Sequence, residues 1–381
     1  MELLLVQTRI VFIAHSFERG GAQKCLYDFV RYCCGEGIEC MVIGPRSGPQ
    51  LQDFRNLGVE VIPVRIASIW GSGTFLDIIQ YIKIFLNTVQ ITRLLLRFRP
   101  IAVFTNSSTI ISGALASRIL KLRHFWHIHE NFDNITMEAS FAIPRKALSK
   151  IMELTSEKVI FVSNAAMKSI LPNGSSKAAV VHNGVDLSRF KFQNHSVSKD
   201  NKPCICFLGA LEHRRGVDIL LLALALLKHE NGRAPRLDLW GSGDPEYSRL
   251  LKDLADELGL TEQVRFMGYT NSIEQVLPKY DALVAPSRGE AFPLTVLEGM
   301  AAGVPVVATK CGGPEEMIDD GISGHLVDVG DYRHMARSLE KILEDHEYAG
   351  RLAAEARSKV SRSFELSRQL EKLAQLILPS S

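Results

Sequence analysis

Short apolar runs rich in β-branched residues alternate along the chain with longer amphipathic stretches. Such runs are "RIVFIAH", "ECMVIG", "VEVIPV", "IAVFT", "HFWHIH", "KVIFVS" and "AAVVHN" in the first half, and "CICFLG", "RLDLWG", "VRFMG", "ALVAPS", "VPVVAT" and "GHLVD" in the second. Near-continuous apolar strands are typical of parallel sheets covered by helices on both faces. The pattern therefore predicts an α/β protein with doubly wound parallel sheets, and with helices such as 23–36 and 109–122 between the strands.

The alternation is interrupted once, by the polar stretch "DLSRFKFQNHSVSKDNKP" (186–203), which ends in a proline. This composition is typical of a linker between domains. The 381 residues are enough for two domains of ordinary size. We therefore expect two Rossmann-like domains, 1–196 and 197–362, which face each other across a cleft. In such sheets ligands bind beyond the carboxyl ends of the strands.

Positive charge is concentrated in the first half of the chain. Residues 1–196 contain 22 Lys and Arg against 14 Asp and Glu, whereas residues 197–381 contain 22 against 28. Such an excess favours an anionic partner or a membrane surface. The alternative is that these basic residues only solvate the surfaces of helices. They are expected at the ends and on the faces of three helices: Arg93, Arg97 and Arg99; Arg118, Lys121 and Arg123; Arg145, Lys146 and Lys150.

Neither the cysteines nor the apolar segments indicate secretion or membrane insertion. The seven cysteines include no Cys-x-x-Cys pair and no metal-binding spacing. An odd number without a recognisable signal peptide favours a reducing cytoplasm. The longest apolar helix candidate, 75–98, contains four charged residues, so we expect an amphipathic helix rather than a transmembrane one.

Two strand ends have residues suited to binding an anion. Gly20 and Gly21 follow the first strand and open a helix, where glycines let the backbone approach a ligand and the helix dipole favours negative charge. Ordinary tight turns also use such glycine pairs. In the second half, Arg214 and Arg215 precede a helix, and cations there oppose the helix dipole unless an anion binds. The alternative is a solvated surface pair.

A third strand end carries two carboxylates, Glu290 and Glu298, the second inside the apolar run 292–308. A buried carboxylate needs a cation or hydrogen-bond donors, and a vicinal diol such as that of ribose offers two donors. The alternative is an exposed glutamate in the first turn of a helix, favoured by the dipole. Together the three strand ends predict a site for a nucleoside diphosphate with a sugar attached.

At this point the sequence resembles the retaining GT-B glycosyltransferases of family 4. The most specific segment is Glu290-x7-Glu298 within "PSRGEAFPLTVLEGMAAGVPVVATKCGGPEEMIDDGISGHLV". Supporting segments are "GGAQ", "VSNAA", "VVHNGVDLSRF" and "GSGDPEYSRLLKDLADELGLTEQVRFMGY". The resemblance implies that 1–196 binds the acceptor, that 197–362 binds the nucleotide-sugar donor, and that a C-terminal helix, 363–381, returns to the first domain.

The resemblance also implies roles for individual residues. The expected catalytic residues are Glu290, beside the sugar ring, and His129, near the sugar. His127 is expected to face the other side of its strand and to be structural. Donor-binding residues are expected in both domains, among them backbone amides at a helix start, two cations for the phosphates, a base-pocket residue and the ribose carboxylate: Gly20, Gly21, Gly209, Arg214, Arg215, Tyr269, Phe292, Pro293, Leu294, Thr295 and Glu298.

Two positions depart from the family pattern. Ala210 stands where an arginine is common, and Pro293 stands where a glycine is common. Arg214 is expected to compensate for the first change.

The implied function is a retaining transfer of a hexose from a UDP-sugar, such as UDP-glucose, to a saccharide acceptor of cell-surface polysaccharide. The acceptor is expected to be lipid-linked, and the enzyme to act at the cytoplasmic membrane face. No cofactor, metal or nucleic acid is expected, and the chain contains no Asp-x-Asp motif. The alternatives are a non-catalytic nucleotide-sugar binder, a transferase acting on a small soluble molecule, and a sugar-nucleotide epimerase.

Overall fold

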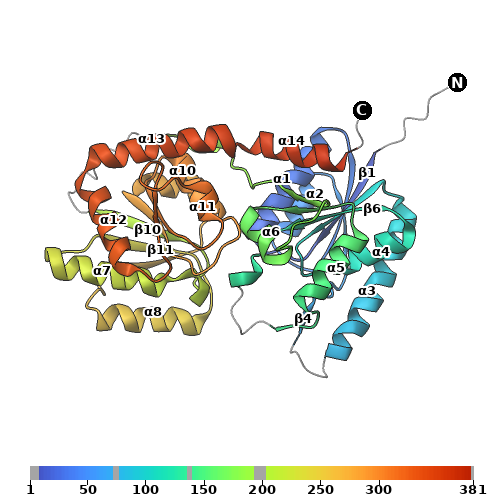
Figure 1. Ribbon diagram of the computed structural model, residues 1–381, viewed down its shortest axis with the longest axis horizontal. Coiled ribbons are helices and arrows are strands. Elements are labelled where there is room, and N and C mark those ends of the chain that lie inside the picture. The colour runs from blue at the N-terminus through green and yellow to red at the C-terminus, as the bar shows by residue number, and fades with distance from the viewer. Residues whose placement is uncertain (1–7, 72–76, 135–139, 193–202, 379–381) are drawn as a thin grey trace. The chain divides into compact units, whose positions relative to one another are not determined.

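The computed structural model describes residues 8–71, 77–134, 140–192 and 203–378, and it divides the chain into two compact units. The first unit contains Met1–His182 together with Gln369–Ser381, and the second contains Asn183–Arg368 (Figure 1). The boundary expected between 196 and 197, within the candidate linker, lies outside the described residues.

The first unit is built on a seven-stranded parallel sheet with the order β3-β2-β1-β5-β6-β8-β9. Its strands are β1 (Arg9–Ala14), β2 (Glu39–Gly44), β3 (Glu60–Pro63), β5 (Ala102–Asn106), β6 (Arg123–Ile128), β8 (Lys158–Phe161) and β9 (Ala178–Val180). A short antiparallel pair is formed by β4 (Trp70–Gly71) and β7 (Ser140–Phe141). The helices are α1 (Gly21–Gly35), α2 (Gln50–Asn56), α3 (Asp77–Phe98), α4 (Ser112–Leu120), α5 (Arg145–Thr155) and α6 (Asn164–Ile170), with a 3-10 turn η1 (Phe132–Asn134).

The second unit is built on a six-stranded parallel sheet with the order β12-β11-β10-β13-β14-β15. Its strands are β10 (Cys204–Leu208), β11 (Arg236–Trp240), β12 (Val264–Gly268), β13 (Ala282–Ala285), β14 (Val306–Thr309) and β15 (His325–Val327). The helices are α7 (Val217–Asn231), α8 (Pro245–Glu257), α9 (Ile273–Val276), α10 (Leu294–Ala302), α11 (Pro314–Met317), α12 (Tyr332–Glu344), α13 (His346–Ser363) and α14 (Leu366–Ile377), of which α14 crosses into the first unit. Three 3-10 turns, η2 (Leu187–Arg189), η3 (His213–Arg215) and η4 (Leu277–Lys279), complete the unit.

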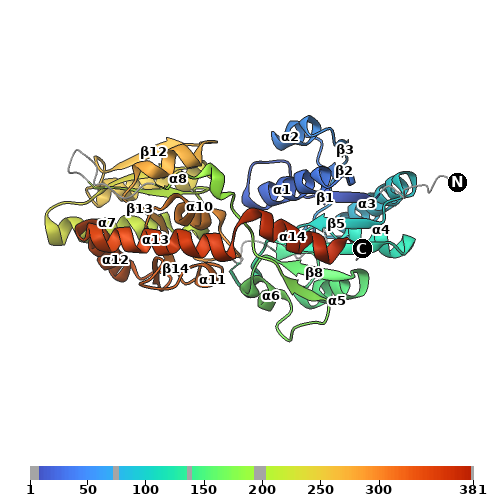
Figure 2. The same ribbon diagram turned by 90° about the horizontal axis from the view of Figure 1, so that it is seen from above.

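The expected fold class is confirmed, because every apolar run named above forms a parallel strand and helices lie on both faces of each sheet (Figure 2). Burial on both faces explains why the strands have little polar alternation, since each residue of β5 and β10 is buried. The end of α14 belongs to the first unit, where the Arg123 guanidinium donates to the carbonyl oxygen of Ile377 at 3.0 Å.

Strand order reverses once in each sheet, between β1 and β5 in the first and between β10 and β13 in the second. At such a switch point the loops that follow neighbouring strands diverge to opposite faces and leave room for a ligand. The loop after β1 contains Gly20, and the loops after β10 and β13 contain Arg215 and Glu290. These three candidate residues therefore lie in loops at the switch points, where open α/β sheets bind ligands.

Two of the expected basic clusters are placed differently. Helix α3 ends at Phe98, so Arg99 lies beyond it with a φ of 54°. Arg123 begins β6 instead of ending a helix, and its guanidinium pairs with Glu157 at 2.7 and 2.8 Å. Helix α4 ends at Leu120, before Arg123, because its C-cap residue Lys121 takes a left-handed conformation.

No helix within the described ranges combines the length and the hydropathy that crossing a bilayer requires.

Candidate functional site

Two glycines allow the loops at the switch point of the second sheet to approach each other. Gly216, the N-cap of α7, has a φ of 68°, and a Cβ there would lie 2.0 Å from the carbonyl oxygen of Pro286. Gly209 follows β10 with a φ of 155°, and a Cβ there would lie 3.2 Å from the Phe207 ring and 3.7 Å from the Arg215 guanidinium. Positive φ favours glycine at both positions, and close packing against Pro286 requires it at Gly216.

Glu290 and the two arginines expected to bind phosphate form one cluster. The Glu290 carboxylate accepts hydrogen bonds from Arg215 Nη1, from Arg214 Nη1 at 3.5 Å and from Ser287 Oγ at 3.1 Å. The Glu290 side chain is 10% exposed and that of Arg215 is 19% exposed, so this ion pair is largely withdrawn from water. Arg215 Nε is buried and makes no hydrogen bond to any described residue. A buried donor of this kind is a place for an acceptor on a ligand.

A second ion pair, which the sequence reasoning missed, holds the arginine loop in place. Arg288 donates to both oxygens of Asp218 at 2.9 and 2.6 Å, and its backbone N–H donates to the carbonyl oxygen of Arg214 at 2.8 Å. Burial raises the pKa of Asp218, but hydrogen bonds from Arg288 and Tyr247 outweigh it and lower the pKa overall. The ion pair joins the start of α7 to the loop after β13, and the backbone bond joins that loop to the loop after β10.

Helix α10 begins where the site residues were expected at a helix start. Pro293 is its N-cap and Leu294 its first residue. Since proline has no backbone N–H, the backbone N–H groups at this helix start are those of Phe292, Leu294 and Thr295, and Pro293 cannot be the amide donor that was expected. Glu298 is only 6% exposed and lies in the second turn of α10. This finding contradicts the alternative of an exposed glutamate in the first turn.

Tyr269 follows β12 and is 54% exposed. The ends of β10, β11 and β12 are joined by backbone hydrogen bonds, from Gly209 N to Trp240 O at 2.9 Å and from Gly241 N to Gly268 O at 2.8 Å. Tyr269 therefore lies at the same edge of the sheet as Gly209, with the end of β11 between them.

In the first unit, Gly20 and Gly21 are exposed at the start of α1, with Gly20 as the N-cap. The φ of Gly20 is −141°, a value that any residue can adopt. A Cβ on Gly20 would meet only the flexible Gln23 side chain, at 2.5 Å. Any requirement for glycine here therefore comes from what approaches the loop and not from its backbone conformation.

His129 belongs to a hydrogen-bonded network at the carboxyl ends of β1, β5 and β6. Its Nε2 lies 2.9 Å from Asn106 Oδ1 and 3.1 Å from His127 Nδ1. Asn106 donates from Nδ2 to the carbonyl oxygen of Ala22 at 3.1 Å, which leaves Oδ1 as the acceptor for an Nε2 proton on His129. His15 Nδ1 in turn lies 3.1 Å from the carbonyl oxygen of Asn106.

Burial lowers the pKa of His129 well below its usual value, and the neighbouring His127 and His15 lower it further. The imidazole is therefore neutral at neutral pH, with Nδ1 as an acceptor. The expectation that His127 faces away from His129 was wrong, because the ring centroids lie 4.2 Å apart. Residues two apart in a strand point to the same face.

Glu130, which the sequence reasoning also missed, anchors the segment that carries His129. It accepts hydrogen bonds from the Ser107 hydroxyl, from Ser108 N and Oγ at 3.1 and 2.9 Å, and from the backbone N–H of His129 at 3.2 Å. Ser107 has a φ of 102°, unusual for a residue other than glycine. The available signal was the acidic residue directly after the second histidine of "HIHE".

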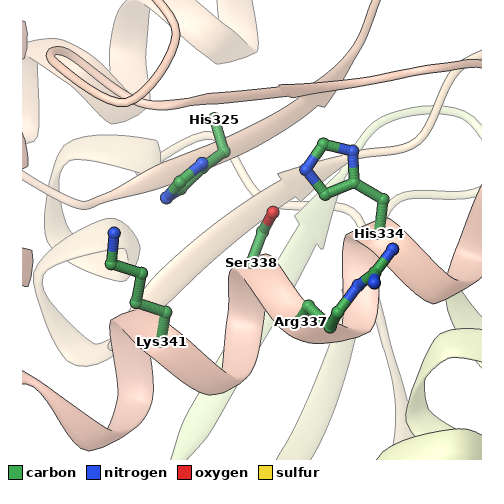
Figure 3. A pocket seen from close by; sticks show the side chains of 5 residues that line it. All are labelled: His325, His334, Arg337, Ser338 and Lys341. Atoms are coloured by element: carbon green, nitrogen blue, oxygen red, sulfur yellow. The ribbon is translucent and has the colours of Figure 1, made fainter.

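A separate basic pocket in the second unit is lined by His325, His334, Arg337, Ser338 and Lys341 (Figure 3). The latter four residues lie on α12, whereas His325 begins β15. The candidate loops follow the carboxyl ends of β10 and β13, so His325 lies at the opposite edge of this parallel sheet. The pocket is not part of the candidate site.

The two parallel sheets, with ligand-binding loops at their switch points, define the GT-B class of proteins. The model of Glycosyltransferase Family 4 matches residues 19–189, and that of the Glycosyl transferases group 1 matches residues 188–359. The chain belongs to this glycosyltransferase family.

Among curated relatives, a lipopolysaccharide core biosynthesis glycosyltransferase of Rhizobium meliloti is 32% identical over 46% of this chain and 49% of its own length. The putative glycosyltransferase EpsD of Bacillus subtilis is 34% identical over 41% of this chain and 40% of its own length. The chain thus spans less than half the length of these relatives. Among solved structures, that of Anabaena HepE in complex with UDP and glucose has a TM-score of 0.80 at 20% identity, and the match covers 97% of this chain and 98% of that chain. At this identity the likeness shows the fold alone.

Proposed function

We propose that the protein is a retaining hexosyltransferase that uses a UDP-sugar donor, with UDP-glucose as the favoured donor. The observation that carries the proposal is the cluster of Arg214, Arg215 and Glu290 at the switch point, with its buried and unsatisfied Arg215 Nε. A diphosphate oxygen would supply the missing acceptor, and the guanidinium groups would neutralise its charge. The uridine assignment is supported by the similar fold of Anabaena HepE, which was crystallised with UDP and glucose.

The remaining donor contacts follow from burial and position. Glu298 would accept two hydrogen bonds from the ribose hydroxyls, and Tyr269 would contact the base. Gly209, the amides of Phe292, Leu294 and Thr295, and the packing of Pro293 would border the sugar and the diphosphate. From the first unit, Gly20 and Gly21 would approach the phosphates.

The transfer step requires no nucleophile from the protein. The bond between the sugar C1 and the phosphate oxygen breaks, and a bond from C1 to the acceptor oxygen forms on the same face. The acceptor proton passes to the departing phosphate oxygen. Glu290 would orient the sugar, and the neutral His129 would accept a hydrogen bond from a sugar hydroxyl. Arginines and helix amides would stabilise the leaving group without a metal ion.

The acceptor we propose is a lipid-linked saccharide used for cell-surface polysaccharide, at the cytoplasmic face of the membrane. Support comes from the matched lipopolysaccharide core biosynthesis glycosyltransferase. The excess of basic residues in 1–196 also suits an anionic surface. A transferase for small soluble acceptors is the alternative.

Incubation of the protein with UDP-glucose in the absence of acceptor tests the proposal. We expect slow release of UDP and glucose, unaffected by excess EDTA, and loss of this release in Glu290→Ala. A non-catalytic binder would bind UDP without releasing glucose. Activity that is lost in EDTA and restored by Mg²⁺ or Mn²⁺ would contradict the metal-free mechanism.

A thermal-shift series with UDP, GDP and ADP identifies the base. A ligand at about 100 times its Kd adds about 2.7 kcal/mol of stability, so the cognate nucleotide should stand out clearly.

A further inference from the structure

An exposed apolar face on α3 is a feature of the first unit that the proposed chemistry does not use. Six large side chains in the first half of this helix are 45–66% exposed: Ile78, Ile79, Tyr81, Ile82, Phe85 and Leu86. Their spacing places them along one side of the helix. The other side is packed, with Ile84 at 4%, Thr88 at 6% and Ile91 at 0% exposure. A contiguous apolar face of this kind marks an interaction surface.

This face lies at the edge of the sheet that also carries the His129 network. Gln80 Nε2 at the start of α3 donates to the carbonyl oxygen of Ser68. The backbone N–H of the next residue, Ile69, donates to the carbonyl oxygen of Thr109 at 2.8 Å. Thr109 Oγ1 lies 2.8 Å from Ser107 Oγ, which donates to Glu130 beside His129. A surface bound to this half of α3 would therefore adjoin the His129 network, in the unit that is expected to bind the acceptor.

The charges on α3 identify the kind of surface. Helix α3 contains three basic residues, Lys83, Arg93 and Arg97, against a single acidic residue, Asp77, at its first position. All three basic side chains are exposed. Apolar side chains flanked by cations are the composition of helices that lie in the interface of an anionic bilayer. Two copies of the chain paired through this face would instead bring together two helices that each have a net positive charge, which disfavours the pairing.

We propose that the apolar face of α3 docks on the surface of an anionic lipid bilayer. Ile82, Phe85 and Leu86 enter the boundary between headgroups and acyl chains, and Lys83 contacts anionic headgroups. The proposal deepens the proposed function, since the docked helix brings the acceptor side of the first unit to the layer where a lipid-linked saccharide is found.

Co-sedimentation with vesicles of equal parts phosphatidylcholine and phosphatidylglycerol tests the docking. Ile82→Gln/Phe85→Gln removes apolar area and keeps every charge, so we expect its vesicle partitioning to fall roughly tenfold or more. The matched control is Leu250→Gln/Ile322→Gln, which replaces residues that are 54% and 58% exposed in the second unit, and it should bind vesicles like the unmodified protein. Lys83→Glu should weaken binding most at low salt.

Equal vesicle binding by the α3 variant and the unmodified protein would overturn the proposal, as would the absence of binding at low salt. Sedimentation velocity without lipid tests whether a second copy of the chain binds to this face instead. A dimer that becomes monomeric in Ile82→Gln/Phe85→Gln would assign the face to a second copy of the chain and likewise overturn the proposal. Release of glucose from UDP-glucose needs no membrane, so all variants should retain it, and its absence from the unmodified protein would instead contradict the proposed function.

Discussion

The two carboxylates of the Glu290-x7-Glu298 motif have different surroundings. Glu290, in the loop after β13, accepts hydrogen bonds from two arginines and from Ser287. Glu298 is buried within α10, after four residues of helix. Two carboxylates in such different environments are suited to different tasks, which is consistent with the roles proposed for them, Glu290 beside the sugar and Glu298 at the ribose.

Replacing Glu298 by Gln keeps the side-chain shape and removes the charge. If Glu298 binds the ribose diol, the affinity for UDP should fall by roughly 1–3 kcal/mol, the range for hydrogen bonds to charged groups. Affinity for inorganic pyrophosphate, which has no ribose, should hardly change. Titration calorimetry with both ligands measures the difference, and an equal loss for both would remove the ribose assignment.

Glu290→Ala and His129→Ala should lower turnover far more than they weaken UDP binding. Both groups are proposed to contact the sugar as it departs, and such contacts contribute to the transition state rather than to nucleotide affinity. Paired measurements of turnover and of UDP binding separate the two effects. Normal turnover in either variant would exclude that residue from the catalytic set.

At the scale of elements, the site depends on how two loops are held against each other. The backbone bond from Arg288 to Arg214 joins the loop after β13 to the loop after β10, and the Arg288–Asp218 pair joins the same loop to the start of α7. Gly216 lets α7 begin directly against Pro286. The loops are thus positioned by contacts outside the ligand, so part of the site is organised before a donor binds.

Helix α7 offers a matched pair of glycines, one at each end, both with a φ of 68°. A Cβ at Gly216 would meet the Pro286 carbonyl oxygen at 2.0 Å, whereas a Cβ at Gly232 would have nothing within 4 Å. Gly232→Ala therefore reports the backbone strain alone, roughly 1–2 kcal/mol. We expect Gly216→Ala to lower the free energy of unfolding by more than this and also to weaken UDP binding. Equal effects of the two substitutions, measured by urea unfolding, would argue against tight loop contact.

At the scale of the whole molecule, the two units differ in their buried ionisable groups. The first contains three histidines that burial keeps neutral, at positions 124, 127 and 129, and its exposed apolar helix face. The second contains the arginine cluster and the buried Glu298. Burial also lowers the pKa of His325 in the second unit, so acid should destabilise both units, and the first unit, with three such histidines, more strongly.

Burial lowers the pKa of His124 to about 3, and that of His127 also to about 3, from the usual value near 6.5. Between these values the unfolded chain binds protons that the folded unit does not. Stability should therefore be constant above about pH 7 and fall as the pH decreases below about 6.5, by at most about 1.4 kcal/mol per pH unit for each histidine. Urea unfolding over this range measures the slope.

His124→Gln provides the check, since it removes one titrating group. His124 bonds to Thr105 Oγ1 at 2.9 Å and to Ser156 Oγ at 3.0 Å, so the variant should be less stable at neutral pH but have a shallower pH dependence. An unchanged slope would contradict the assignment of the pH dependence to this residue.

The sequence alone was sufficient to predict the strands of the two parallel sheets and the class of fold, but not the short antiparallel pair of β4 and β7. In these runs of β-branched residues the side chains on both faces of the strand are apolar, and a doubly wound parallel sheet buries both faces under helices. It also located the loops after β1, β10 and β13, because glycines and charged residues directly follow these strands, and the carboxyl ends of parallel strands are where such sheets bind ligands. Local chemistry and chain order contain this information.

What only the tertiary structure decided is which groups meet. The contact of His127 with His129, the support of His129 by Glu130 and the Arg288–Asp218 pair join residues whose neighbours depend on packing. The exposed face of α3 could not be predicted either, because an apolar stripe is the same in sequence whether another element covers it or not. Hydrophobic periodicity determines that a helix has an apolar side, and only the assembled unit determines which part of that side remains open.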